Sequence, residues 1–385
     1  MTQIELLEDL LNKAIINFNK KNRKKKFSDL IVANIDTIVE SIDKNKSLVS
    51  ALVTSLLKKI VDPSQDIRLH RTDFEGGYSA RSLDIDITTP FFKKHFPKYA
   101  NKESGFLSMA TRTQIPWTKE DGSRIRTRAS SEFMHSFLEI FDAIESKIIN
   151  PKEALLYFFE KLYTLSLQQK MIFDGTIETS DYIHIININS VLQMLEKHFS
   201  IDERGTSRLP VIAIYSIYQQ LFVQVKRYQN KILRPLNVHT SSDKHGYGDI
   251  EIWNEDNTPF EIIEIKHNIL IDRNLIFDIV KKCEKTKIER YYILTTAKNN
   301  FSSPEEEDFI NKFILKIQKD TELYIIANGI FLSLKYYLRF IDDYKGFIKS
   351  YTLNLVNDSK NSTEIKESHI SAWKRILEEY EVKTI

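Results

Sequence analysis

The sequence predicts an α/β (α+β) fold in which helices flank a mixed β-sheet, preceded by a largely helical N-terminal region. Two observations lead to this prediction. Apolar residues recur at helical spacing through the first 62 positions. Between positions 250 and 327, by contrast, short runs rich in apolar and β-branched residues alternate with helix-like stretches, which is the order expected of a sheet covered by helices.

Composition limits the classes of protein to consider. The chain has 385 residues, of which 42% are hydrophobic, enough for two or more domains with their own cores. The formal net charge is only +2, so a nucleic-acid partner would have to be met by local basic patches. The single cysteine, Cys283, excludes an intramolecular disulfide. The chain has no basic leader and no run of about 18 apolar residues, so we expect a bacterial cytoplasmic protein without signal peptide or membrane segment.

The N-terminal region is predicted to begin with helices at residues 4–15, 31–42 and 47–61. Residues 20–26 form a basic run that is either a solvated loop between helices or a loop that contacts phosphate. A glycine turn then leads into a stretch that contains Asp84 and Asp86. These two acids either bind a metal ion or, more simply, cap the helix near Pro90 or pair with Arg81.

The segment 111–128 is the candidate for reading DNA. It is basic and polar, with Trp117 among its residues. The predicted DNA-binding residues are Arg112, Gln114, Arg124, Arg126 and Arg128. The last three alternate, so in an extended strand they would line one face, and guanidinium groups match both guanine edges and phosphate oxygens. The alternative is a solvated loop.

A domain boundary is predicted at the polar break of residues 200–206. Before it, residues 133–144 and 151–170 have helical apolar stripes, and residues 184–188 could form a short strand. The predicted division is therefore 1–203, a mostly helical recognition region, and 204–385, which contains the sheet.

After the boundary, the predicted elements alternate. An apolar helix at residues 209–228 precedes a hairpin, in which Ile250 and Ile252 alternate with acids in the first strand. The second strand, residues 260–266, is apolar enough for the middle of a sheet. The elements predicted beyond it are a helix at 273–287, a strand at 290–296, a helix at 304–319, a strand at 322–327, and helices at 330–351 and 364–380.

The hairpin carries the candidate chemistry. Glu264 and Lys266 are two residues apart on the second strand and therefore share a face. If the hairpin pairs as its turn suggests, Asp249 of the first strand lies near Glu264. Two close carboxylates repel each other, and Mg²⁺ relieves that repulsion because it takes carboxylate ligands and retains waters. A neighbouring lysine can hold a water or stabilise phosphate charge, which suits metal-assisted phosphodiester hydrolysis.

A structural alternative is an exposed hairpin with Glu–Lys pairs across its strands. The apolar second strand argues against it. Acid-x-Lys by itself is weakly specific, because it recurs at residues 145–147, 364–366 and 381–383, in stretches without an upstream strand aspartate.

Gly248-Asp249, a hairpin turn and then Glu264-Ile265-Lys266 resemble the signature of the PD-(D/E)xK, or restriction-endonuclease-like, nucleases. The resemblance covers about residues 209–329, and Gly248 stands where a proline often precedes the aspartate. It implies that Asp249 and Glu264 bind the metal, that the Ile265 carbonyl faces it, and that Lys266 orients the attacking water.

The same resemblance suggests accessory groups. Gln220 or Gln219, on the helix before the sheet, could lie near the metal, although a solvated amide is the plain alternative. Glu251, on the first strand of the hairpin, is a further accessory candidate. His245, in the loop before the hairpin, could touch phosphate or be an ordinary loop histidine.

The resemblance implies a Mg²⁺-dependent type II restriction endonuclease that hydrolyses double-stranded DNA. Palindromic targets favour a homodimer, because protein symmetry mirrors site symmetry. No methyltransferase fingerprint is visible, so a companion DNA methyltransferase would have to protect the host. The alternatives are a repair, recombination or defence nuclease of the same superfamily and a non-catalytic DNA-binding protein.

Overall fold

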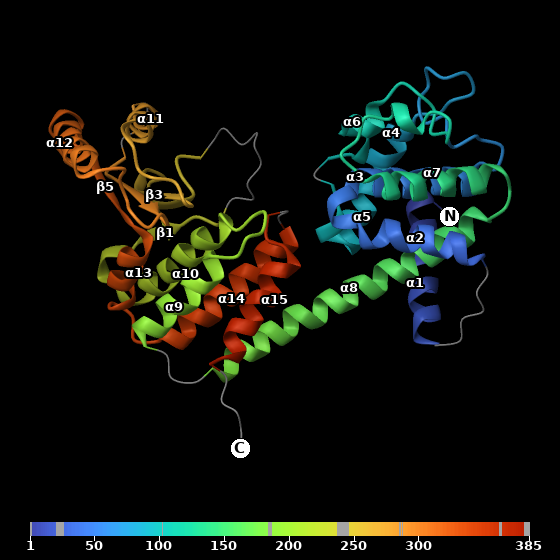
Figure 1. The fold of residues 1–385 in the computed structure, drawn as a ribbon. Coiled ribbons are helices and arrows are strands. Elements are labelled where there is room, and N and C mark those ends of the chain that lie inside the picture. Colours follow the sequence, from blue (N-terminus) through green and yellow to red (C-terminus); the bar gives the residue numbers. More distant parts are fainter. Residues whose placement is uncertain are drawn as a thin grey trace. The chain divides into compact units, whose positions relative to one another are not determined.

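The computed structural model describes residues 2–20, 27–101, 103–183, 187–236, 246–284, 286, 288–361 and 364–380. The chain forms two compact units, Met1–Met171 and Ile172–Ile385 (Figure 1). The division falls inside the long helix α8 (Pro151–Tyr182). It precedes the polar break at residues 200–206, where the sequence places the boundary.

The polar break is a turn within the second unit. There the Thr206 hydroxyl donates to the carbonyl oxygens of Ile201 and Glu203 at 2.9 and 2.7 Å. Arg208, directly after the turn, is buried and its guanidinium bonds Asp358 at 2.9 Å. The turn is therefore tied into the packing of the second unit, although its composition is typical of a linker.

The first unit is helical, in agreement with the prediction. Its longer helices are α1 (Gln3–Asn19), α2 (Asp29–Glu40), α3 (Ile42–Val61), α5 (Thr89–His95), α7 (Ser131–Glu145) and the first part of α8. Between them lie short turns of helix: α4 (Ala80–Leu83), a π-turn η1 (Asp84–Thr88), α6 (Met109–Arg112), and the 3₁₀ turns η2 (Pro97–Tyr99), η3 (Gly105–Leu107) and η4 (Gly122–Arg124).

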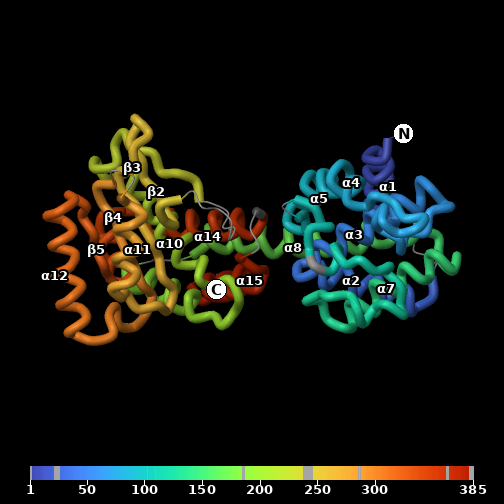
Figure 2. The backbone as a smooth tube through the Cα atoms, turned by 90° about the horizontal axis from the view of Figure 1, so that it is seen from above, coloured from blue at the N-terminus to red at the C-terminus, as the bar shows by residue number. Residues whose placement is uncertain are grey.

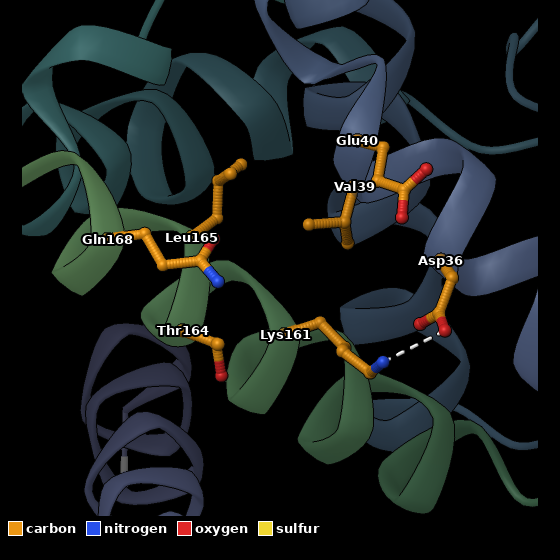
Figure 3. A pocket seen from close by; sticks show the side chains of 7 residues that line it. All are labelled: Asp36, Val39, Glu40, Lys161, Thr164, Leu165 and Gln168. Carbon is orange, nitrogen blue, oxygen red and sulfur yellow. Dashed lines mark hydrogen bonds and ion pairs between the residues drawn. The ribbon is translucent and has the colours of Figure 1, made fainter.

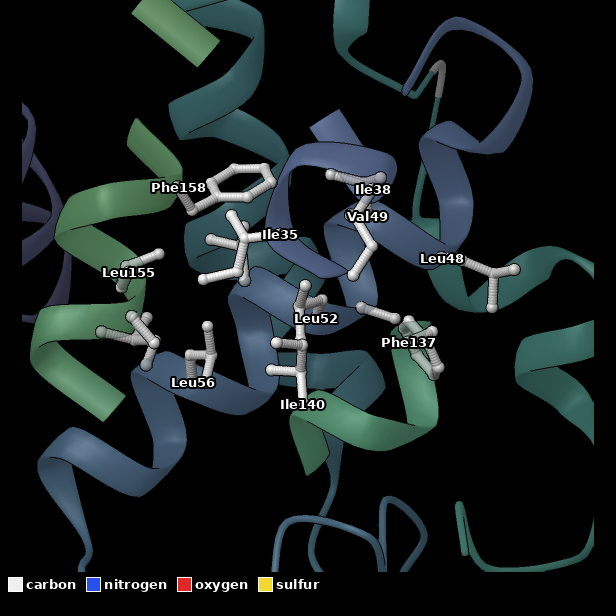
Figure 4. Close-up of a cluster of buried hydrophobic side chains, with 14 of the residues drawn as sticks. Ile35, Ile38, Leu48, Val49, Leu52, Leu56, Phe137, Ile140, Leu155 and Phe158 are labelled. Atoms are coloured by element: carbon white, nitrogen blue, oxygen red, sulfur yellow. The ribbon is translucent and has the colours of Figure 1, made fainter. Parts of the chain in front are cut away.

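The core of the first unit forms around α3. Figure 4 shows Leu52 and Leu56 of this helix beside Ile35 of α2, Ile140 of α7 and Phe158 of α8, all of them buried. Burying side chains of this size stabilises the fold by about 1.5–3 kcal/mol each. The helical spacing of these residues in the sequence is what brings them to one side of each helix.

Asp84 has a structural role in this unit. Its carboxylate is fully buried and accepts hydrogen bonds from the Ser50 hydroxyl at 2.6 Å, the Gly105 N–H at 2.8 Å and the Ser104 hydroxyl. Asp86 is exposed instead. The alternating stretch forms a helical turn, in which residues two apart do not face each other. The metal pair considered for Asp84 and Asp86 is therefore not formed.

The second unit contains the mixed five-stranded sheet. Its strands are β1 (Lys231–Leu233), β2 (Ile250–Asn254), β3 (Pro259–Lys266), β4 (Arg290–Thr295) and β5 (Tyr324–Gly329), in that spatial order. The first three are antiparallel and the last three are parallel. The helices are α9 (Ile188–Phe199), α10 (Arg208–Gln224), α11 (Arg273–Cys283), α12 (Pro304–Thr321), α13 (Ile330–Leu338), α14 (Tyr344–Asn361) and α15 (Glu367–Glu378), with a 3₁₀ turn η5 (Lys226–Tyr228).

The predicted mixed α/β architecture, with its helical N-terminal region, is confirmed. The hairpin β2–β3 and the alternation of helix and strand after it form where the sequence places them. Most of residues 20–26 and 184–188, and the loop with His245, lie outside the described residues. Of the described helices, none combines the length and the apolar character needed to cross a membrane.

Strand β3 has two different faces because successive side chains alternate. Ile262 packs with Tyr291 and Ile293 of β4 under helices α11 and α12. Ile263 and Ile265 belong to the opposite core, which α9, α10 and α13 cover. Figure 1 shows these two helical layers on either side of the sheet, and Figure 2 gives the view from above, with the strands β2 to β5 labelled. The face of Ile262 also carries Glu264 and Lys266, and the other face carries Glu261.

Candidate active site

Asp249 is held beside Glu264 by the backbone of β3. Its N–H donates to the Ile263 carbonyl at 2.9 Å, and its Oδ2 accepts from the Ile265 N–H at 2.7 Å. These two bonds lie on either side of Glu264 in the chain. The register of β2 on β3 pairs Ile250 with Ile263, and one further step brings Asp249 level with Glu264. The hairpin thus places Asp249 level with Glu264 of the neighbouring strand, as the sequence predicts.

The close approach of Gly248 to β3 explains why glycine precedes Asp249, where the resembling nucleases often have proline. A Cβ at this position would lie 2.5 Å from Ile262 Cγ2 and 2.8 Å from the Ile263 carbonyl oxygen. Side chains do not tolerate such contacts with backbone, so glycine lets the chain approach β3 closely enough for Asp249 to reach it.

Glu264 is 8% exposed and lies among cationic and hydroxyl groups. Its Oε1 is 2.7 Å from Lys266 Nζ. Its Oε2 is 3.7 Å from Lys282 Nζ of α11 and 3.2 Å from the Tyr291 hydroxyl of β4. Glu264 and Lys266 share the predicted face, and Lys282 supplies a second ammonium that the motif does not include.

Tyr291 links the acidic pair to the segment before it. Its fully buried hydroxyl is 2.7 Å from the Tyr247 carbonyl oxygen, the nearer of its two acceptors. Burial raises the pKa of Tyr291 far above its usual range, and the charges of Glu264 and Asp249 raise it further. The hydroxyl therefore stays protonated and can act as a donor to Glu264.

Glu251 supports the site indirectly. Its Oε1 accepts from the Tyr247 N–H at 2.6 Å, and its Oε2 accepts from Trp253 Nε1 at 2.9 Å. Oε1 therefore fixes the segment whose carbonyl meets the Tyr291 hydroxyl, and Oε2 holds Trp253 of the same strand as Glu251. This arrangement gives Glu251 a positioning role for the predicted site.

The structure does not bring Gln220 to the acidic pair. Its side-chain amide donates to the Ser350 hydroxyl of α14 at 2.8 Å. Gln219 Oε1 accepts from Asn354 of the same helix at 2.7 Å. Helix α10 packs on the face of the sheet opposite to Glu264, so both amides serve the contact between α10 and α14.

The predicted DNA-binding residues lie in the first unit and are exposed: Arg112, Gln114, Arg124, Arg126 and Arg128. They do not form the extended strand considered for them, because η4 ends at Arg124 and irregular chain follows. Exposure still alternates there, with Ile125 buried between two exposed arginines. Arg124 pairs with Asp121 at 2.7 Å.

Trp117 is not available to DNA. It is fully buried and stacks on His70, with 4.0 Å between the ring centroids. Its place in a basic segment gave no sign of this, because the aromatic residues it packs on, such as Phe137 and Phe141, come from α7.

The copy of the acid-x-Lys pattern in α7 has a different environment. Glu145 bonds Lys59 Nζ at 2.8 Å and the Ile67 N–H at 3.0 Å. It joins α7 to the end of α3 and the loop after it, and no strand aspartate accompanies it. Of the described copies, Glu264 is the one in a hairpin beside an aspartate.

The acidic pair offers the type of ligand that a magnesium ion takes. Within the described ranges, His, Cys, Asp and Glu side chains form no group of three or more suited to a metal ion. Mg²⁺, however, is commonly held through one or two carboxylates together with waters and phosphate oxygens. Asp249 and Glu264 supply two carboxylates at one point of the sheet, so the donor set fits this ion.

Comparison with known proteins adds no family: no protein-family model and no curated protein matches the chain. Evidence about its function therefore comes from the residues of the chain itself.

Proposed function

We propose that this chain is a Mg²⁺-dependent type II restriction endonuclease with the restriction-endonuclease-like fold. The observation that carries the proposal is the arrangement at the end of β3. Asp249 is bonded to the backbone on both sides of Glu264, and Lys266 lies on the same face, 2.7 Å from Glu264. This is the carboxyl end of a strand in a mixed sheet, where α/β proteins usually place their ligands.

Asp249 and Glu264 would hold the ion, with the Ile265 carbonyl as a further candidate ligand. The ion, when bound, would supply an activated water and neutralise charge on the scissile phosphate. Lys266 has three donors, so its ammonium can remain on Glu264 while donating to a water or a phosphate oxygen. Lys282 would add positive charge on the same side.

Double-stranded DNA is the proposed substrate. The exposed arginines of the first unit, Arg112, Arg124, Arg126 and Arg128, would meet its phosphates and base edges, together with Gln114. Recognition of a palindrome favours a homodimer, since a two-fold protein places two equal sites on a two-fold target. A companion methyltransferase would protect host DNA without binding this chain.

The test is digestion of plasmid DNA with Mg²⁺ by the full chain and by two variants, Asp249→Asn and Lys266→Ala. Because the metal ligand and the water-orienting amine act mainly in the transition state, we expect cleavage to fall by about 10³-fold or more in each. DNA binding in EDTA should stay close to that of the unaltered chain. Discrete bands support a restriction enzyme, whereas smears or structure-specific cuts support a repair or defence nuclease.

Lys147→Ala is the matched control, because Lys147 ends an acid-x-Lys copy in the first unit and is exposed. Its cleavage should equal that of the unaltered chain. If either Asp249→Asn or Lys266→Ala cleaves at the normal rate, the assignment of the site is wrong. Binding of DNA without any cutting would support a non-catalytic DNA-binding protein.

A further inference from the structure

The first unit has a cavity of about 210 Å³ beside helix α6. Three arginines from separate stretches of chain line it: Arg71 from the loop after α3, Arg81 from α4 and Arg112 from α6. Only Arg112 belongs to the basic segment that the sequence singles out. The other two join it through the fold.

The lining of this cavity carries excess positive charge. Asp73 is its one acid, and it forms a forked ion pair with Arg71, with Nη2 2.5 Å from Oδ2. Within the described part of the chain, no hydrogen bond or ion pair engages the guanidinium groups of Arg81 and Arg112. His70, in the floor, adds no charge near neutral pH, because burial lowers its pKa to about 4. Two guanidinium charges are therefore left over.

The cavity is shaped by the backbone rather than by flexible side chains alone. Arg71 Nη1 donates to the Arg112 carbonyl at 3.0 Å and so joins the loop to α6. The loop turns tightly, since a Cβ on Gly77 would lie 1.8 Å from the Arg71 carbonyl oxygen. In the floor, Phe106 is buried and His70 stacks on Trp117. The backbone around the cavity therefore needs little ordering when a ligand binds.

The chemistry of this lining matches a phosphate group. Guanidinium forks bond phosphate oxygens in pairs, and the hydroxyl of the exposed Thr72 offers one more donor. A volume of about 210 Å³ is below the range of roughly 300–1,000 Å³ usual for drug-sized ligands. It suits a phosphate with part of one nucleotide and is too small for a dinucleotide cofactor.

We propose that the cavity lined by Arg71, Arg81 and Arg112 is a site for the phosphate group of one nucleotide unit, either of DNA or of a free nucleotide. DNA as the source rests on the proposed function; the phosphate site itself does not. With DNA as the source, the proposed DNA-contacting surface extends from the exposed basic segment into this cavity.

A second hollow of the first unit differs from the arginine-lined cavity in the charge of its lining. It measures about 160 Å³ between α2 and α8, and Asp36, Glu40 and Lys161 are among its lining residues (Figure 3). The Lys161 ammonium bonds Asp36 at 2.8 Å, as the dashed line in Figure 3 marks. With two carboxylates and one paired ammonium, this hollow would repel an anion.

The experiment uses the full chain carrying Asp249→Asn, in EDTA, so that binding is measured without cleavage. Inorganic phosphate and deoxyadenosine 5′-monophosphate are titrated by calorimetry, and a short DNA duplex is titrated by fluorescence anisotropy over a range of salt. The test variants are Arg81→Gln and Arg112→Gln. The control is Lys147→Gln, an exposed cation of the same unit that does not line the cavity.

Each test variant should weaken binding of phosphate or nucleotide about tenfold or more, because it removes a charge-assisted hydrogen bond to the phosphate. If DNA is the source, each should also lower the salt dependence of duplex binding by about one phosphate contact. A free nucleotide as the source would give saturable nucleotide binding with unchanged salt dependence on DNA. Unchanged thermal unfolding of the variants would show that the fold is intact.

The proposal is overturned if the parent chain binds none of the three probes, or if Arg81→Gln and Arg112→Gln bind them as tightly as the parent does. Equal loss of nucleotide affinity in Lys147→Gln would also overturn it, because general surface charge would then account for binding. Cleavage is not measured in this experiment. The phosphate site can therefore stand if the nuclease proposal fails, and it can fail while plasmid cleavage is intact.

Discussion

Strand β3 carries two glutamates three residues apart on opposite faces of the sheet, and their surroundings differ. Glu261 is 1% exposed, and its Oε2 is 2.8 Å from Arg227 Nη2. Its Oε1 accepts from the hydroxyls of Tyr218 and Tyr228 at 2.8 and 3.3 Å. Glu264, on the other face, has a second carboxylate beside it and two lysines that reach it from the surface.

The difference separates a structural acid from the one that we propose as a metal ligand. Burial raises the pKa of Tyr218 well above its usual range, so its hydroxyl remains a donor that satisfies Glu261. The negative charge of Glu261 is thus met by one guanidinium and two hydroxyls, with no further acid to balance. Glu264 and Asp249 bring two carboxylates together at the end of β3, and a bound cation would relieve the repulsion between them. The two glutamates differ in their surroundings because they lie on opposite faces of the strand.

The largest expected effect comes from exchanging each glutamate for glutamine. Glu264→Gln removes a proposed metal ligand, so we expect plasmid cleavage to fall by about 10³-fold, while the free energy of unfolding changes by less than about 1 kcal/mol. Glu261→Gln should do the reverse. It weakens the bonds to Arg227 and two tyrosines and should lower the free energy of unfolding by about 2 kcal/mol. Arg227 is partly exposed, which keeps this loss moderate.

Both variants are measured by urea unfolding and by cleavage rate per folded molecule at a temperature where each remains folded. Glu261→Gln is the matched control for Glu264→Gln, since the exchange and the strand are the same. If Glu261→Gln loses cleavage as strongly as Glu264→Gln does without unfolding, the contrast between the two faces is wrong.

Those parts of this contrast that depend on the local sequence could be predicted. The alternation of isoleucines and acids around Ile250 and the apolar run of β3 predict the hairpin, and spacing by two predicts that Glu264 and Lys266 share a face. The turn between the strands then brings Asp249 near. Each of these three predictions depends only on residues close in the chain or on the pairing within one hairpin.

Groups that reach the site through tertiary packing were not predictable in this way. Tyr291 meets Glu264 only because β4 pairs parallel to β3 in the register Glu264–Ile293, and Lys282 reaches it from α11. Alternation along β4 gives a signal that Tyr291 and Ile293 share a face, but not which strand lies beside them. Burial of Trp117 and the arginine-lined cavity likewise depend on contacts between distant segments.

A smaller effect on stability is expected when the pH is lowered. It arises in the helical layer that covers the Glu261 face of the sheet. His198 of α9 is fully buried; its Nδ1 accepts from the Tyr351 hydroxyl at 2.8 Å and its Nε2 donates to the His369 carbonyl at 2.9 Å. Burial lowers the pKa of His198 to about 3. Below pH 6.5 the unfolded chain therefore binds a proton that the folded chain does not. Stability should fall as pH drops from about 6.5 toward 3, by up to about 1.4 kcal/mol per pH unit.

Urea unfolding at pH 7 and pH 5 measures this dependence, and His198→Gln should reduce it by about 2 kcal/mol over that interval. His135→Gln is the control, because the His135 side chain is 68% exposed and should leave the dependence unchanged. Full retention of the acid sensitivity in His198→Gln would show that this histidine is not held neutral by its burial.

The smallest effect should come from removing one hydroxyl on each face. Tyr291→Phe deletes the group that joins Glu264 to the Tyr247 carbonyl, and Tyr218→Phe deletes a donor to Glu261. Each should lower the free energy of unfolding by about 1 kcal/mol, the usual worth of one such bond. Only Tyr291→Phe should also slow plasmid cleavage, by about fivefold to tenfold, because Glu264 loses a group that orients it. Equal cleavage rates in the two variants would mean that the Tyr291 hydroxyl serves packing alone, and that the acidic pair is oriented by the backbone of β3 and its lysines.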